Sequence, residues 1–323
     1  VYVDGKKVIA SWTEHSVQMD EAMIKLEAGK TFKLQVEYFD NGGDCFAGLY
    51  WKAPSAGSQN VLARFGDAGK VAAECDVTVA VLGINKSIER EGQDRFSLEL
   101  PVDQQEFIKE LYKVNPNTVV VLVAGSSMAV NWMDENVPAI LNAWYPGEQG
   151  GNAVAEVLFG DYNPGGRLPL TYYNSLDEIP AFDNYFVKGR TYQYFEGQPL
   201  YEFGYGLSYT KFRYKSKGVN VEQDTVKVSF EVSNTGKYDG DEVTQVYVKY
   251  PETGTYMPLK QLHGFKRVHI KKGKTSKVTI GVPKKDLRYW DEQERKFVTP
   301  KGEYTFMVGA SSDDIKFRET VGL

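Results

Sequence analysis

Two continuous runs of apolar residues constrain the fold of this chain more than any other feature. VTVAVLG (77–83) and TVVVLVAG (118–125) are rich in valine and do not alternate with polar residues, as is typical of strands buried on both faces. The segment between them, residues 101–115, predicts a helix with Pro101 at its first position. Its apolar face would be formed by Phe107, Ile108, Leu111 and Val114. Strand, helix and strand in this order predict an α/β domain with a mostly parallel sheet.

The segments on either side of this domain alternate instead between apolar and polar residues. Near the start, Asp4 and Gly5 lie between two short alternating runs and predict a hairpin, and TFKLQVEYFD (31–40) predicts a strand. After residue 215, short strands are separated by Gly, Asn and Pro, which predicts a small β-sandwich. The strands expected there are VKVSFEVSNTG, DEVTQVYVKYP, KVTIGVP and EYTFMVGASS.

These changes of pattern divide the 323 residues into four parts. We expect a β-rich segment over 1–56, which ends in a turn-rich linker, and an α/β domain over 57–175, which includes a second helix at 150–161. Residues 176–214 have many Tyr, Phe and Gly without periodicity and predict a long ordered connection to the β-sandwich over 215–323. The fold class is therefore multidomain, α/β plus all-β.

Composition excludes several classes of function. Hydrophobic residues make up 42% and charged residues 25%, so the chain is globular, and a net charge of −5 without a basic cluster argues against nucleic-acid binding. No apolar run is long enough to span a membrane. No nucleotide-binding, zinc or EF-hand motif is present, so neither a cofactor nor a metal is expected. Cys45 and Cys75 are expected to be free or merely structural, because no redox or catalytic motif surrounds them.

The charged stretch GINKSIEREGQDR (83–95) directly follows the first buried strand. It places Glu89, Glu91 and Asp94 within six residues, at the end of a parallel strand where ligands bind in open α/β sheets. Clustered carboxylates can act there as general acid and base, and the alternative is a solvated loop held by Glu–Arg pairs.

A Gly-Ser-Ser turn after the second buried strand is the other candidate for chemistry. A serine nucleophile is poorly supported there, because His15, His263 and His269 all lie outside the α/β domain. We therefore expect this turn to be structural.

The ordered set of motifs resembles the C-terminal portion of glycoside hydrolase family 3, the family of β-glucosidases and β-xylosidases. YVDGKKVIASW, IKLEAGKTFKLQVEYFD and AGLYWKAP resemble the later part of a PA14 domain. GINKSIEREGQDRFSLELP and the run from VNWMDENVPAIL to GGRLPLTYY resemble the family's α/β-sandwich domain, and GRTYQYFEGQPLYEFGYGLSYTKF resembles its linking segment. VSNTGKYDGDEVTQVYV, LHGFKRV and PKGEYTFMVGASSDDI resemble its fibronectin type III-like domain.

The resemblance implies a retaining reaction with two carboxyl groups. The nucleophilic Asp would belong to an N-terminal barrel domain of the same enzyme, which this sequence lacks, and this chain would supply the general acid/base. Matching EREGQDR to the family pattern with Arg95 as the fixed point gives Glu91 this role, whereas counting from Gly83 favours Glu89. Asp94 and Arg95 would support the loop. Trp132 and Trp144 also match family positions and are interpreted as core residues.

The implied function is removal of terminal non-reducing β-D-xylosyl or β-D-glucosyl residues from oligosaccharides. Ile88 stands where the glucosidase branch often has Trp, so the xylosidase branch is the nearer match. We expect a secreted or periplasmic enzyme, a homodimer as one hypothesis for its assembly, and a piece that is inactive without the barrel. The alternative is a non-catalytic carbohydrate-binding or structural protein.

Overall fold

The computed structural model describes residues 1–13, 20–27, 29–39, 47–49, 62, 65–254 and 256–323. These residues form two compact units, which are considered one at a time. The first contains Val1–Ala124 and Asn136–Asn142, and the second contains Gly125–Glu135 and Ala143–Leu323. His15, Cys45, the expected linker after Pro54 and the expected boundary at 56/57 lie outside the described residues.

The predicted N-terminal hairpin is present at the start of the first unit. β1 (Tyr2–Val3) and β2 (Lys6–Lys7) are antiparallel, and the two residues between them have the positive φ values of a type I′ turn, 48° at Asp4 and 77° at Gly5. β3 (Leu34–Gln35) pairs with the other edge of β1. The strand expected over 31–40 is therefore wrong in extent, because β1 offers it only two residues to pair with.

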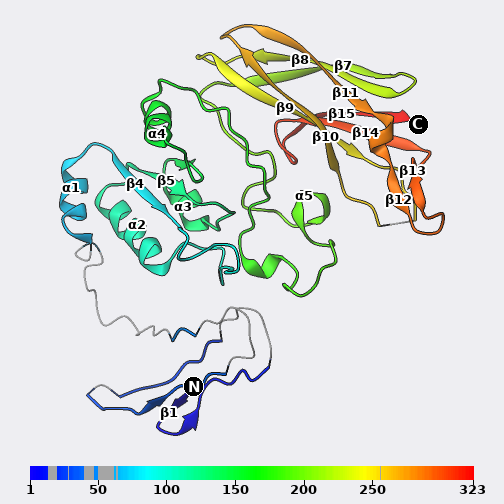
Figure 1. Ribbon diagram of the computed structural model, residues 1–323. Coiled ribbons are helices and arrows are strands. Elements are labelled where there is room, and N and C mark those ends of the chain that lie inside the picture. The colour runs from blue at the N-terminus through cyan, green and yellow to red at the C-terminus, as the bar shows by residue number, and fades with distance from the viewer. Residues whose placement is uncertain (14–19, 28, 40–46, 50–61, 63–64, 255) are drawn as a thin grey trace. The chain divides into compact units, whose positions relative to one another are not determined.

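A three-stranded parallel sheet forms the α/β part of the first unit (Figure 1). Its order is β4 (Thr78–Gly83), β5 (Thr118–Val123) and β6 (Ile140–Asn142). Burial on both faces holds for the central strand β5, but in β4 Val79 and Val81 are 45% and 66% exposed. The expectation for β4 is wrong because this strand lies at the edge of the described sheet and the described residues leave one of its faces uncovered.

Two helices accompany this sheet, α1 (Ala68–Glu74) and α2 (Val102–Val114). Ile108 and Leu111 of α2 are buried, as its apolar face predicts, whereas Val114 is 39% exposed. Pro101 is not the first helical residue as expected, since its ψ of 140° places it one position earlier, at the cap. The buried Asn115 amide after α2 donates to the carbonyls of Ala72 and Cys75 and so joins the ends of both helices.

The second unit begins with helices and a long connection. α3 (Asn131–Asn136) belongs to this unit except for its last residue, Asn136. α4 (Gly150–Phe159) ends before Gly160, whose φ of 83° is the left-handed conformation that terminates helices. α4 is thus two residues shorter than expected. The connection expected over 176–214 contains only two short helices before residue 212, η2 (Leu176–Glu178) and α5 (Thr191–Tyr194), in agreement with its lack of periodicity. Its last three residues belong instead to a strand, which begins at Phe212.

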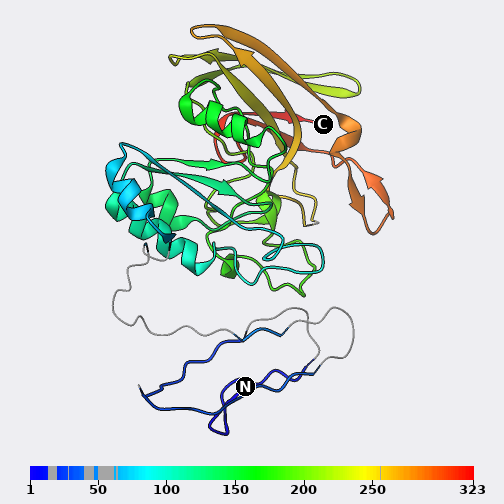
Figure 2. The ribbon, with the colours of Figure 1, turned by 60° about the vertical axis from the view of Figure 1, so that its left-hand side comes forward.

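The C-terminal part of this unit is a β-sandwich of two antiparallel sheets (Figures 1 and 2). The first sheet has the order β10-β9-β14-β15 and the second the order β11-β8-β7. The strands are β7 (Phe212–Val221), β8 (Thr225–Asn234), β9 (Gly240–Lys249), β10 (Gln261–Ile270), β11 (Thr275–Pro283), β14 (Glu303–Gly309) and β15 (Ile315–Gly322). The helix η3 (Lys284–Leu287) and the hairpin of β12 (Tyr289–Asp291) and β13 (Lys296–Val298) lie between β11 and β14.

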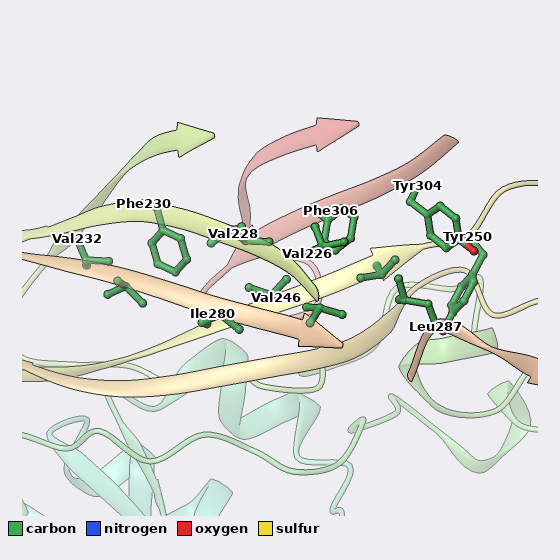
Figure 3. Close-up of a cluster of buried hydrophobic side chains, with 14 of the residues drawn as sticks. Val226, Val228, Phe230, Val232, Val246, Tyr250, Ile280, Leu287, Tyr304 and Phe306 are labelled. Carbon is green, nitrogen blue, oxygen red and sulfur yellow. The ribbon is translucent and has the colours of Figure 1, made fainter. Parts of the chain in front are cut away.

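The core of the sandwich is built by alternate residues of both sheets (Figure 3). In β8, Val226, Val228 and Phe230 are at most 1% exposed, while the residues between them face outward. Val246 of β9 and Phe306 of β14 are fully buried from the opposite sheet. The two-residue period of these strands is therefore the direct cause of the core.

A buried ion pair joins the segment that follows α4 to the sandwich. Arg167 Nη2 donates to Glu242 Oε2 at 2.9 Å, and the Tyr214 hydroxyl donates to Glu242 Oε1 at 2.5 Å. The side chains of Arg167 and Glu242 are only 9% and 3% exposed. Burial raises the pKa of Glu242, and Arg167 and then the Tyr214 hydrogen bond oppose that shift.

Candidate active site

The end of β4 can be occupied only by glycine. Gly83 has a φ of 155°, and a Cβ atom there would lie 1.8 Å from the carbonyl oxygen of Val123 on β5. Gln104 of α2 then fixes this residue from both sides, since its Oε1 accepts from Gly83 N and its Nε2 donates to Gly83 O, each at 2.8 Å. Strand, helix and loop are therefore joined at one residue, from which the charged loop departs.

The first half of the loop is ordered by an asparagine turn. Asn85 Oδ1 accepts from Ser87 N at 2.8 Å and from Ser87 Oγ at 2.6 Å. The backbone N–H groups of Ile88 and Glu89 donate to Asn85 O, and Gln93 Nε2 donates to Ser87 O at 3.0 Å. Sequence reasoning missed the positioning roles of Asn85, Gln93 and Gln104. Only Asn85 carried a signal, the Asn-x-Ser spacing that favours such turns.

Glu91 lies at the tip of a tight turn. Arg90 and Gln93 exchange both backbone hydrogen bonds, at 3.1 and 3.0 Å, and Gly92 at the third position has a φ of 74°, which is the type II pattern. Glu91 is exposed, and within the described part of the chain its carboxylate makes no hydrogen bond or ion pair. The turn therefore presents this carboxylate outward on a well-defined backbone.

Glu89 is engaged with the protein itself. Its Oε2 accepts from Arg95 Nε at 2.6 Å, with the side chains of Glu89 and Arg95 26% and 9% exposed. Arg95 Nη1 also donates to Leu98 O at 3.4 Å. This ion pair closes the base of the loop, with the turn that carries Glu91 between its two partners in the sequence.

The structure brings together Glu89, Glu91 and Arg95 on one loop but gives Asp94 no visible bracing contact. Asp94 is exposed and forms no hydrogen bond or ion pair with any described residue. The structural support of the loop is divided instead among Glu89, Arg95 and the polar side chains named above.

The Gly-Ser-Ser turn shows a packing reason for its glycine. A Cβ atom at Gly125 would lie 2.5 Å from the ring of Tyr145. His263 contacts the Tyr250 hydroxyl at 2.8 Å, and His269 contacts Asp241 at 2.7 Å, so both described histidines are engaged within the sandwich. Trp132 and Trp144, which the sequence analysis interprets as core residues, are both half-buried.

No group of three or more His, Cys, Asp or Glu side chains among the described residues could hold a metal ion. Among the same residues, no helix is long and apolar enough to cross a membrane.

Comparison with known proteins finds two family models. Residues 11–209 match the glycosyl hydrolase family 3 C-terminal domain, and residues 242–312 match the fibronectin type III-like domain. The first model alone covers more than half of the chain, so the similarity is not limited to one motif.

Individual relatives agree with these models. The chain is 35% identical to the xylan 1,4-beta-xylosidase of Xylanibacter ruminicola, over 97% of this chain and 37% of the relative. It is 33% identical to the periplasmic beta-glucosidase of Salmonella typhimurium, over 86% of this chain and 38% of the relative. The crystal structure of the Kluyveromyces marxianus beta-glucosidase in complex with glucose matches with a TM-score of 0.74 and 36% identity, over 80% of this chain and 33% of that one. The chain thus spans less than half of each of these proteins.

Proposed function

Because this chain belongs to glycosyl hydrolase family 3, we propose that it supplies the general acid/base of a retaining exo-β-glycosidase. The substrates would be oligosaccharides with terminal non-reducing β-D-xylosyl or β-D-glucosyl residues. The observation that carries this proposal is the exposed carboxylate of Glu91, held outward on a turn directly after a parallel strand while Glu89 is tied to Arg95.

In the proposed reaction, Glu91 acts twice. In its protonated form it donates a proton to the glycosidic oxygen as the bond to the leaving group breaks, and the carboxylate formed then takes a proton from the water that releases the sugar. The nucleophile would be an Asp of an N-terminal barrel domain outside this chain, about 5–5.5 Å from the acid/base in the assembled enzyme. A carboxylate that no described residue of the chain holds suits this task, since it can accept and release a proton without breaking a contact among those residues.

Glu89 is better suited to a positioning role. Its removal would take away the carboxylate that accepts from the largely buried Arg95 side chain, which costs stability at the base of the loop. Asp94 is an exposed residue of the same loop, and no role in the reaction is proposed for it.

The proposal also covers the domain organisation, the location, the sugar released and the oligomeric state of the enzyme. We propose a PA14-like segment over 1–56, an α/β-sandwich domain over 57–175, a linking segment over 176–214 and a fibronectin type III-like domain over 215–323. A periplasmic or secreted location is supported by the name of the Salmonella relative. The proposal includes both xylose and glucose as the terminal sugar that is removed, since the relatives include a xylosidase and glucosidases. A homodimer is testable by sedimentation of the complete enzyme.

The test is substitution of Glu91 in the complete enzyme. Glu91→Ala should lower kcat for substrates with poor leaving groups by about 10²–10⁴-fold, the usual contribution of general acid–base catalysis. Substrates with good leaving groups need no protonation, so they should be affected least, and azide should restore turnover by attacking the glycosyl-enzyme and giving a β-glycosyl azide.

Glu99→Ala is the matched control, since Glu99 is an exposed glutamate of the same loop. It should leave both kcat and azide sensitivity unchanged. If Glu89→Ala shows the leaving-group dependence and azide rescue and Glu91→Ala does not, the assignment of the acid/base to Glu91 is wrong.

A further inference from the structure

A cavity of 250 Å³ lies in the second unit, and none of its lining residues belongs to the charged loop that carries Glu91. It opens between α5, the segment before β10 and the start of β12, which can be located in Figure 1. We call it the aromatic pocket, after its lining residues Tyr194, Tyr250, Tyr256 and Trp290; Gln261 and Arg288 also line it.

One wall of the aromatic pocket is a ladder of stacked rings. The ring of Tyr256 stacks on Tyr194 with centroids 5.3 Å apart and planes 21° apart. Phe186 stacks on Tyr256 from the connection, at 5.8 Å and 29°. The ladder joins segments distant in sequence, and it holds the Tyr256 ring in place although this residue is 44% exposed.

The loop that carries Phe186 is fixed by its own hydrogen bonds. Arg190 Nη2 donates to the carbonyl oxygens of Pro180, Ala181 and Asn184, at 3.2, 2.9 and 2.9 Å. Asn184 Oδ1 in turn accepts from Phe186 N at 3.0 Å. A wall that is already ordered loses little conformational entropy when a ligand binds, so the pocket is preorganised.

The other wall is the hairpin of β12 and β13. Trp290 is 50% exposed and contacts Phe297 edge to face at 5.3 Å. The guanidinium of Arg288 lies 5.7 Å from the centre of the Phe297 ring, and its Nε donates to Lys285 O at 2.5 Å. A large ring surface is therefore held at the pocket with part of its area open to solvent.

The polar groups of the pocket are mostly hydrogen-bond donors that the protein leaves open. The Tyr250 hydroxyl donates to Gln261 Oε1 at 3.0 Å and so orients the Gln261 amide. Among the described residues, Gln261 Nε2 and the hydroxyls of Tyr194 and Tyr256 have no hydrogen-bond partner. Desolvation by burial raises the pKa of the Tyr194 hydroxyl, so it stays protonated and able to donate.

We propose that the aromatic pocket binds one sugar ring of a neutral β-linked oligosaccharide. The apolar C–H face of a pyranose would lie on Trp290, and its hydroxyls would accept from Gln261 Nε2 and the tyrosine hydroxyls and donate back to them. No described lining residue is Asp or Glu, and Arg288 is the one lining cation among them, which fits an uncharged ligand better than an anion.

The size of the cavity agrees with this ligand. Pockets for drug-sized molecules measure roughly 300–1,000 Å³, so 250 Å³ holds one ring while the rest of the chain extends into solvent. The choice of xylose or glucose as the ring rests on the proposed function, whereas the binding of a neutral sugar rests on the pocket alone.

The test is titration of the 323-residue chain with xylotetraose and cellotetraose, followed by calorimetry and tryptophan fluorescence. We expect saturable binding of at least one of them with a Kd below about 1 mM. Trp290→Ala and Tyr256→Ala should each weaken it about tenfold, or about 1.4 kcal/mol. Trp290→Phe keeps a ring and should bind better than Trp290→Ala.

Tyr238→Ala is the matched control, since Tyr238 is a tyrosine of the same unit that is 60% exposed and does not line the pocket. It should bind as the unsubstituted chain does, and circular dichroism should show that all variants are folded. Absence of saturable binding overturns the proposal, and so does binding by Trp290→Ala and Tyr256→Ala that is as tight as binding by the unsubstituted chain.

A Glu91→Gln variant separates this proposal from the proposed function. Its binding should be unchanged, because Glu91 does not line the pocket. Loss of binding in Glu91→Gln would refute the pocket as the site, whereas failure of the Glu91 kinetics in the complete enzyme would leave this binding measurable.

Discussion

Replacement of Arg167 by methionine is a direct test of how the segment that follows α4 is held to the sandwich. Methionine keeps much of the side-chain volume but removes the donor that faces Glu242 at 2.9 Å. Glu242 is 3% exposed, so its carboxylate would remain buried, and among the described residues the Tyr214 hydroxyl would be its one remaining hydrogen-bond donor. The cost of an uncompensated buried charge should therefore dominate the result.

The expected loss is about 3–5 kcal/mol at neutral pH, the usual cost of removing one partner of a buried pair. Because 1 kcal/mol lowers Tm by about 2–4 °C in a domain of roughly 150–250 residues, Tm should fall by about 6–20 °C. Replacement of both partners by apolar residues, as in Arg167→Met with Glu242→Leu, should recover most of the loss, since no charge then remains buried.

The loss should also depend on pH. The pKa of Glu242 is raised by burial, so its contribution to stability is fully present below the ordinary glutamate pKa and is lost as the pH rises through the raised value. Arg167 opposes that shift, and Arg167→Met should raise the pKa of Glu242 further. The difference in stability between variant and parent should therefore be largest near neutrality and should shrink as the pH falls below the ordinary glutamate pKa of 4.5, where Glu242 is protonated in both.

The assay is urea unfolding of the chain, followed by circular dichroism at several pH values. The matched control is Arg213→Met, because Arg213 is an exposed arginine on β7, and it should change stability by no more than about 0.5 kcal/mol. A loss below about 1 kcal/mol for Arg167→Met at pH 7, or one that does not vary with pH, would refute the reasoning.

Two further predictions concern the loop and the isolated chain. Gly83→Ala should destabilise the first unit and lower Tm in a thermal melt, because the added Cβ would lie 1.8 Å from Val123 O. Gly151→Ala is the control and should have little effect, because the space around its added Cβ is open. An unchanged melt for Gly83→Ala would contradict the close approach of β4 and β5. The 323-residue chain alone should release no chromophore from aryl β-xylosides or β-glucosides, since the proposed nucleophile is outside it. Measurable turnover that Glu91→Ala abolishes would contradict the proposal that acid/base and nucleophile belong to different parts of the enzyme.

Local patterns predicted those parts of the fold that depend on near neighbours in sequence. The Asp4-Gly5 pair gave the first hairpin, because both residues adopt positive φ at low cost. The alternation in β8 and β9 gave the sandwich core, because a strand turns every second side chain to the same face. β10 is less regular, with a bulge between Leu262 and Gly264, and was not predicted as a separate strand.

The same patterns failed where pairing decided the outcome. Residues 31–40 alternate as strongly as a strand, yet among the described residues 31–39 only Leu34 and Gln35 pair, since a strand exists only over the length of its partner. The exposure of Val79 and Val81 likewise depends on what covers β4, which no single run of residues specifies.

The sequence by itself determined the β-α-β order, the family resemblance and a loop with two candidate glutamates. It left Glu89 and Glu91 open because both are carboxylates in the same charged run, and charge pattern does not state where side chains point. Only the tertiary structure decided that Glu89 contacts Arg95 while Glu91 lies exposed at a turn tip, and that Arg167 meets Glu242 across 75 positions of sequence. These outcomes depend on backbone geometry and burial, which arise when distant segments pack together and not from any one segment alone.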